Sequence, residues 1–90
     1  MRNSFLYHKA VQRVIGLAYD GQEESTPMVT LKENNFVAQK VIQLARRYSI
    51  PIVERPDLVD ALSPFELDQE IPESLFEPVA ILLNQLRERI

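Results

Sequence analysis

The chain has 90 residues and a formal net charge of −3, with 46% hydrophobic and 26% charged residues. This size and composition predict one globular domain, and the lack of cysteine excludes disulfides and thiolate chemistry. The basic residues are scattered, which argues against a nucleic-acid-binding surface. No apolar run approaches the ~20 residues of a membrane-spanning helix, so we expect a cytoplasmic location.

The first strand is predicted after an N-terminal segment without clear periodicity. Residues 1–12 are expected to form an arm or a lead-in segment, and residues 13–90 the folded domain. Arg13 to Tyr19 alternates between two faces that carry no charge after Arg13. This pattern predicts a strand that is covered on both sides.

A second strand and a first helix follow. Pro27 to Lys32 predicts a strand with Val29 and Leu31 directed inward. Asn34 to Tyr48 predicts a helix, because its apolar residues recur at helical spacing. These residues form one stripe, centred on Leu44, that we expect to be buried against the sheet: Val37, Val41, Leu44, Ala45 and Tyr48.

The next elements are short and bounded by prolines. Ile50 to Glu54 is rich in β-branched residues, which predicts a buried strand. With the preceding strand and helix it forms a βαβ unit, for which we expect parallel pairing and a right-handed crossover. Pro56 suits the first turn of a helix that ends near Leu62, because Pro64 disfavours helical dihedral angles in the residue before it.

The last helix is predicted to open at Pro72 and to carry an apolar stripe: Val79, Leu82, Leu83, Leu86 and Ile90. Pro78 interrupts this stripe. Either the helix is kinked there, or a short turn ends and a new helix begins with Pro78 in its first turn. The predicted fold is α/β, with a small mixed central sheet of three to five strands and about four flanking helices.

Few residues offer chemistry. His8 could act as a base near neutral pH, but it lies in the least patterned segment, which favours a surface or arm histidine. Glu54 ends a strand, where ligands gather in α/β sheets, yet the adjoining Arg55 and Pro56 favour a helix-entry acid. The sequence has neither clustered metal ligands nor a glycine-rich phosphate loop, so we expect no metal and no cofactor.

Two segments carry a family resemblance: TPMVTLKENNFVAQKVIQLARRYSIPIVERPDLVDAL and EIPESLFEPVAILLNQL. They resemble the cytoplasmic C-terminal domain of the FlhB/YscU export-switch family of type III secretion. The resemblance covers roughly Lys9 to Leu86, and its most specific parts are IPIVERPDLVDAL and IPESLFEPVA. The segment VIGLAYD is similar to the family's sequence just after its self-cleavage site.

The sequence departs from the family at the cleavage site itself. The family cuts itself in an Asn-Pro-Thr-His loop, where the asparagine side-chain amide attacks its own carbonyl group. Counting back from VIGLAYD, the matching positions are Lys9, Ala10, Val11 and Gln12, and no asparagine of the chain is followed by proline. Because the chain begins with Met1, we expect a stand-alone paralogue of the C-terminal domain that does not cleave itself.

In the family, this domain contacts export substrates through a shallow apolar patch. By motif match, the patch falls on Thr26, Pro27, Ala80 and Leu83, although the spacing of the last two is equally typical of core residues. Thr26 stands where the family has a small apolar residue. The resemblance implies partners among flagellar or type III export-apparatus proteins and export substrates, with no nucleic acid, no metal and only indirect contact with the membrane.

Three functions follow from these observations. The leading one is a non-enzymatic interaction module of flagellar or type III protein export, resembling the substrate-specificity switch but without self-cleavage. The alternative is an unrelated regulatory or adaptor α/β domain, because a fold does not fix a function. The third is a small enzyme centred on Glu54, which lacks an identifiable catalytic partner in the sequence.

Overall fold

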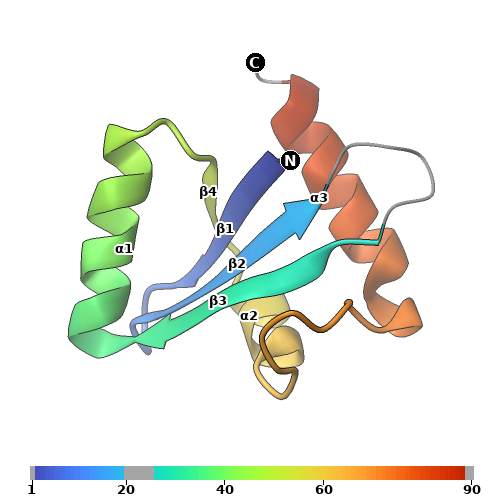
Figure 1. Ribbon diagram of the computed structural model, residues 1–90, viewed down its shortest axis with the longest axis horizontal. Coiled ribbons are helices and arrows are strands. Elements are labelled where there is room, and N and C mark those ends of the chain that lie inside the picture. Colours follow the sequence, from blue (N-terminus) through green and yellow to red (C-terminus); the bar gives the residue numbers. More distant parts are fainter. Residues whose placement is uncertain (1, 20–25, 89–90) are drawn as a thin grey trace.

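The computed structural model describes residues 2–19 and 26–88, which form one four-stranded sheet between helices (Figure 1). Its strand order is β3-β2-β1-β4. The pairs β1–β2 and β2–β3 are antiparallel and the pair β1–β4 is parallel, so the sheet is mixed, as predicted. The strands are β1 (Arg2–His8), β2 (Arg13–Tyr19), β3 (Met28–Asn34) and β4 (Ile52–Glu54).

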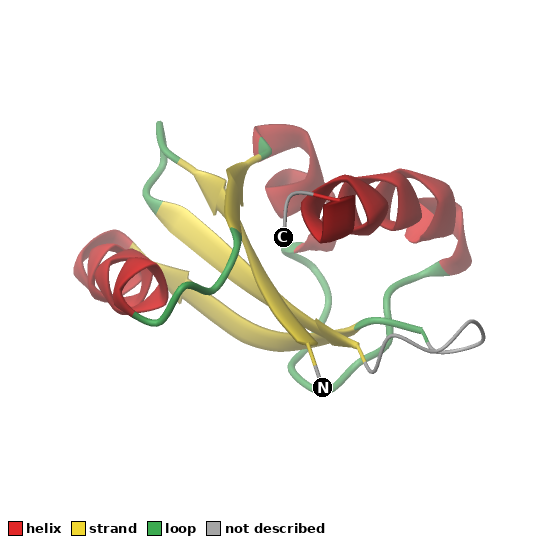
Figure 2. Ribbon diagram, turned by 90° about the horizontal axis from the view of Figure 1, so that it is seen from above, coloured by secondary structure: helices red, strands yellow, loops and turns green. Residues whose placement is uncertain are grey.

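The helices lie on both faces of this sheet (Figure 2). Helix α1 (Asn35–Arg47) covers one face, while α2 (Pro56–Leu62) and α3 (Phe76–Glu88) cover the other. A short 3₁₀ turn, η1 (Glu73–Leu75), precedes α3. The small mixed α/β fold expected from the sequence is therefore confirmed. None of the helices within the described residues has both the length and the apolar character needed to cross a membrane.

Each face of the sheet has its own buried apolar cluster. The larger cluster joins the sheet to α2 and α3, and we call it the main core: Leu6, Ile15, Leu17, Val29, Leu58, Val59, Leu62, Ile71, Val79, Leu82, Leu83 and Leu86. The smaller cluster lies under α1 and contains Val14, Ala38 and Ile42, with Phe5, Tyr7 and Leu31 packed against it. Because β2 contributes to both clusters, its expected burial on two sides is confirmed.

The N-terminal segment is a strand inside the sheet and not the expected arm or lead-in. β1 pairs with β2 along one edge and with β4 along the other, and Leu6 is fully buried. The sequence analysis did not predict this strand, because Phe5, Leu6 and Tyr7 are consecutive apolar residues and show no alternation with polar ones. A strand buried on both faces lacks the alternation of polar and apolar residues by which strands are usually found.

Helix α1 has the predicted extent but not the predicted orientation. Asn34 is its N-cap and Tyr48 its C-cap, yet Leu44 is 49% exposed. The buried residues of the helix are Ala38, Ile42 and Ala45, so of the predicted stripe only Ala45 is buried, while Val41 is half-buried. Two alanines let the helix backbone approach the sheet closely, so the larger side chains of the stripe are turned toward solvent.

A β-bulge divides the apolar residues of β3 between the two faces. Gly16 is paired with Leu31 while Leu17 is paired with Val29, which leaves Thr30 as the additional residue. Val29 consequently belongs to the main core and Leu31 to the cluster under α1. The expectation that both point to the same inward face was wrong, because a bulge shifts the period-two pattern by one residue.

The two strands joined by α1 lie at opposite edges of the sheet. They run in the same direction, but β4 is hydrogen-bonded to β1 and the crossover passes over two strands. Ile52 and Val53 are only half-buried, and Glu54 is exposed. The expected direct pairing of these two strands was therefore wrong, and the short strand is an edge strand and not a buried one.

Local signals placed the last two helices correctly. α2 spans Pro56 to Leu62 as predicted, with Pro56 at its first position. Near the C-terminus, η1 ends at Leu75 and α3 begins at Phe76, which puts Pro78 in the first turn of α3. The second of the two alternatives for Pro78 is the one that occurs. In a first turn the missing amide proton of proline removes no helical hydrogen bond.

Candidate functional site

The four positions that match the cleavage motif form the turn between β1 and β2. His8 and Arg13 are the last paired residues of the hairpin, so Lys9, Ala10, Val11 and Gln12 make a four-residue connection. The Gln12 amide donates a hydrogen bond to the Lys9 carbonyl at 3.3 Å, and Gln12 has a positive φ of 52°. The two strands are thus joined by a tight turn of the kind common in hairpins.

Gln12 connects this turn to the neighbouring elements. The Tyr7 hydroxyl donates to Gln12 Oε1 at 3.0 Å, and Gln39 Nε2 of α1 donates to the same oxygen at 3.1 Å. Gln12 Nε2 donates to the Lys9 carbonyl at 2.9 Å, and the Asn35 amide donates to the Gln12 carbonyl at 2.6 Å. The turn is therefore held by both β1 and α1.

None of the four residues that the sequence analysis matched to the cleavage motif is an asparagine. Lys9, at the position of the family's asparagine, carries an amine and has no side-chain amide that could attack its own carbonyl carbon. The amide side chain that the turn does contain, that of Gln12, is directed to the Lys9 carbonyl oxygen by a hydrogen bond. Ala10, at the position of the proline, imposes no fixed backbone angle.

A polar groove of about 700 Å³ lies beside this turn, between α1 and the β1–β4 half of the sheet. Glu54 contributes to its lining, together with Lys9, Gln43 and Arg46. Arg55, the neighbour that could have paired with Glu54, is engaged elsewhere, because its guanidinium binds Asp57. Glu54 thus has the exposed position expected at a strand end but gains no second group with which to perform acid–base chemistry.

The acid at the entry of α2 is Asp57. Arg55 Nε and Nη2 donate to the two carboxylate oxygens of Asp57 at 3.1 and 2.9 Å. This pairing holds the pKa of the Asp57 carboxyl below its ordinary value. Asp57 lies in the first turn, where a negative charge complements the helix macrodipole, whereas Glu54 precedes the N-cap. The helix-entry role expected of Glu54 therefore belongs to Asp57.

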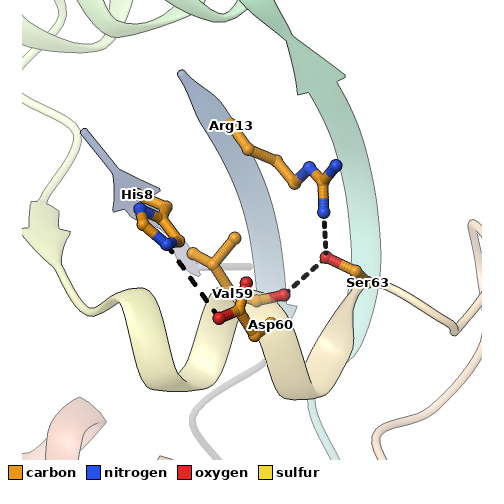
Figure 3. A network of polar contacts seen from close by, with 5 residues as sticks. All are labelled: His8, Arg13, Val59, Asp60 and Ser63. Carbon is orange, nitrogen blue, oxygen red and sulfur yellow. Dashed lines mark hydrogen bonds and ion pairs between the residues drawn. The ribbon is translucent and has the colours of Figure 1, made fainter. Parts of the chain in front are cut away.

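His8 lies at the end of β1 and not in an arm (Figure 3). Its side chain is only 15% exposed, and Nε2 is 3.9 Å from Asp60 Oδ2, which exceeds hydrogen-bond distance. Nearby, Arg13 Nη1 donates to Ser63 Oγ at 3.2 Å, and Ser63 Oγ donates to the Val59 carbonyl at 2.6 Å. These contacts fasten α2 to the sheet, which is a structural role.

The structure also places the residues that the sequence analysis weighed for metal binding and for catalysis. Within residues 2–19 and 26–88, no group of three or more histidine, aspartate or glutamate side chains is placed to hold a metal ion. His8 and Glu54 are the two candidates that the sequence offered for acid–base catalysis. His8 is not hydrogen-bonded to Asp60, and Glu54 gains no catalytic partner from Arg55, which is paired with Asp57.

The four residues of the expected patch divide into two kinds. Thr26 and Pro27 are half-buried just before β3, and Ala80 is exposed on α3. Leu83 is only 7% exposed and belongs to the main core. The spacing of Ala80 and Leu83 had left open whether they belong to the patch or to the core. The structure separates them, since Ala80 lies one turn before Leu83 but on the edge of the buried stripe.

The segment after α2 connects the two parts of this patch. The Ile71 amide donates to the Pro27 carbonyl at 3.0 Å, and Ile71 packs in the main core with Leu83. Val29, two residues after Pro27, belongs to the same cluster. Figure 1 shows α3 passing over the end of the sheet where β3 begins. Segments that are over fifty residues apart in sequence are thus anchored in one region of the fold.

The sequence reasoning missed one surface, the side of α1 that faces solvent. Its apolar stripe was recognised, but was assigned to the core. The overlooked signal was a second row at helical spacing, in which Ala38 and Ile42 join Ala45 of the predicted stripe. This row is less hydrophobic in total but small enough for close packing.

Comparisons with known proteins agree on one family. The family model described as the FlhB HrpN YscU SpaS Family matches residues 10–86. Protein YlqH of Bacillus subtilis is 33% identical over 74 residues, which cover 82% of this chain and 80% of YlqH. The flagellar biosynthetic protein FlhB of Aquifex aeolicus is 36% identical over 70 residues, covering 77% of this chain. The chain spans only 20% of the length of that FlhB.

A solved structure matches almost the whole chain. The cytoplasmic domain of FlhB from Shewanella putrefaciens superposes with a TM-score of 0.83 at 32% sequence identity. The match covers 94% of this chain and 70% of the FlhB domain. At this identity the likeness extends to the sequence as well as to the fold.

Proposed function

The chain belongs to the FlhB HrpN YscU SpaS family, and we propose that it is a non-enzymatic binding module of flagellar or type III protein export. The observation that carries this proposal is the match to the cytoplasmic domain of FlhB over 94% of the chain. The proposed partners are export-apparatus proteins and export substrates, met in the cytoplasm. Nucleic acid, metal and direct contact with the membrane have no part in this function. Because the chain belongs to this family, it is not the unrelated regulatory or adaptor domain that the sequence analysis kept as the alternative.

The proposed partner-binding surface consists of Thr26, Pro27, Ala80 and Leu83. Ala80 is exposed and small, and Leu83 is part of the core beneath it, so a partner side chain could rest over Ala80. Thr26 and Pro27 are half-buried before β3, and in this proposal they form the second side of the surface. A depression lined by apolar groups gains free energy when an apolar partner side chain covers it.

Ala80→Glu is expected to weaken binding of an export substrate at least tenfold, or about 1.4 kcal/mol, without unfolding the domain. The added carboxylate would be desolvated without a counter-charge in the complex, whereas in the free protein it remains in water because Ala80 is exposed. Isothermal titration gives the affinity, and urea denaturation gives the stability. Gln85→Glu adds the same charge at an exposed position about 140° away around α3 and should leave binding unchanged. Unchanged affinity of the folded Ala80→Glu variant would reject the patch.

We further propose that the chain does not cleave itself. Lys9 and Ala10 match the two positions that the family's asparagine and proline occupy. They begin a turn that Gln12 closes, because its backbone amide and its side-chain amide both donate hydrogen bonds to the Lys9 carbonyl. The purified protein should keep its full mass at neutral and mildly alkaline pH, as measured by mass spectrometry. A defined cut between Lys9 and Ala10 would show that the argument from the missing amide is wrong.

A graft of the motif serves as the control for this experiment. The variant Lys9→Asn, Ala10→Pro, Val11→Thr and Gln12→His restores the four residues in the same turn. If the grafted variant is cleaved and the wild-type chain is not, the assay detects the reaction, and the replaced residues explain why the wild-type chain stays intact. An intact graft would show that the turn, and not only its residues, prevents the reaction.

A further inference from the structure

Helix α1 presents a continuous apolar face to solvent. Phe36 is 68% exposed, Leu44 49% and Tyr48 70%, and Val37 is 47% exposed. Single exposed apolar residues are common on protein surfaces, but a contiguous row of them marks an interaction site. We call the row formed by Val37, Val41, Leu44 and Tyr48 the α1 seam. Val37, Leu44 and Tyr48 are exposed, whereas Val41 is half-buried at the edge of the row and packs against the cluster under α1.

The spacing of the α1 seam is that of a helix that packs against another helix. Its residues follow one another at intervals of four, three and four positions, which is the apolar spacing of a helix–helix interface. At 1.5 Å per residue the seam is about 16 Å long. The residues of α1 that are buried in the domain are Ala38, Ile42 and Ala45, and of the seam only Val41 also packs against the cluster under the helix.

The charges of α1 indicate what kind of helix would fit. Between Asn35 and Arg47 the helix has no acidic residue, although the whole chain has a net charge of −3. Lys40 and Arg47 lie along one side of the seam, and Lys40 Nζ is held 5.3 Å from the centre of the Phe36 ring. The macrodipole explains cations in the last turn, such as Arg47, but Lys40 lies farther from the helix end.

We propose that the α1 seam docks an amphipathic helix of a partner protein, with apolar residues at four-three spacing and acidic residues beside them. A second copy of this chain fits less well, because two facing seams would bring Lys40 and Arg47 of both copies together. The seam lies on the opposite side of the sheet from α3, which carries Ala80 (Figure 2). One domain could therefore hold this helix and an export substrate at the same time.

Two synthetic helical peptides test the proposal. Both have leucine at four-three spacing, but the flanking positions are glutamate in one peptide and lysine in the other. In fluorescence anisotropy the wild-type chain should bind the glutamate peptide at least about tenfold more tightly than the lysine peptide. The variant Lys40→Glu, Arg47→Glu should reverse this preference. Added salt should weaken the preference in both proteins.

Variants of the seam separate its apolar contribution from its charge. Leu44→Ala with Tyr48→Ala should weaken binding of the glutamate peptide at least about tenfold. Gln43→Ala, at an exposed position of the same helix outside the seam, should bind as the wild type does. Because Leu44 and Tyr48 are exposed, the urea midpoint should remain close to that of the wild type. A folded double variant with unchanged affinity would overturn the proposal.

Three other results would also overturn it. The first is failure of the glutamate peptide to bind at concentrations up to about 1 mM. The second is loss of peptide binding in Ala80→Glu, which would place the peptide on the other side of the sheet. The third is concentration-dependent self-association that disappears in the Leu44→Ala, Tyr48→Ala variant, which would identify a second copy as the occupant. The first and third results leave the substrate patch untouched, and that patch keeps its own test, the titration of an export substrate.

Discussion

Leu62→Ala is expected to lower the free energy of unfolding by about 2–5 kcal/mol. Leu62 is fully buried in the main core, where α2 meets the sheet. Removing its side-chain methyl groups takes apolar area out of the core and leaves a cavity that the surrounding side chains fill only in part. Because small domains have total stabilities of about 5–15 kcal/mol, this one substitution should shift the urea midpoint far toward lower concentration.

Leu44→Ala is the matched control, since it makes the same chemical change on α1. Leu44 is 49% exposed, so this substitution should alter stability by no more than about 0.5 kcal/mol. The two urea midpoints therefore test how α1 is turned on the sheet. A midpoint for Leu44→Ala as low as that for Leu62→Ala would mean that Leu44, and not Ala38 and Ile42, faces the sheet.

Gly16→Val is expected to cost about 1–3 kcal/mol, although valine is among the best strand formers. A Cβ at Gly16 would lie 3.0 Å from Leu31 Cβ and 3.0 Å from Phe5 Cε1, closer than side chains normally approach. The Phe5 ring fills the space that a side chain at this position would need. Strand propensity alone predicts that Gly16→Val raises the free energy of unfolding, whereas the steric contact predicts that it lowers it. Thermal or urea denaturation of this variant therefore shows which of the two effects is larger.

A second substitution checks the cause of this loss. In a Phe5→Leu background the contact with the ring is removed, so Gly16→Val should cost less than it does in the wild type. Residues in contact show non-additive effects of this kind, whereas independent residues do not. Strictly additive losses would show that the destabilisation has another origin, such as the contact with Leu31.

The elements that the sequence predicted correctly are those with local signals. Pro56 and Pro64 bound α2, and the charge-free alternation from Arg13 to Tyr19 marks β2. Each of these signals depends on the backbone of its own segment and needs no knowledge of the partner elements. β1 lacked such a signal, because Phe5, Leu6 and Tyr7 pack on both faces of the sheet and the polar residues of the strand do not alternate with apolar ones.

The orientation of α1 could not be obtained in the same way. The helix has two apolar rows, and hydrophobicity favours the one with Leu44 and Tyr48. The choice depends on the distance between α1 and the sheet, which is set by partners elsewhere in the chain. Likewise, nothing local distinguishes exposed Ala80 from buried Leu83, because the boundary of the buried stripe is decided by how α3 lies on the main core.

Secretion is the measurement that tests the proposed function most directly. The host is a strain of a flagellated bacterium whose own FlhB lacks the cytoplasmic C-terminal domain. It carries an empty vector, this chain or the Ala80→Glu variant, and the two proteins are present in equal cellular amounts. The amount of an export substrate in the medium is then determined by immunoblot. We predict secretion above the empty-vector level with the wild-type chain and a level close to the empty vector with Ala80→Glu. Secretion no higher with the wild-type chain than with the empty vector would contradict the proposed role in export, and equal secretion with both proteins would contradict the proposed binding surface at Ala80.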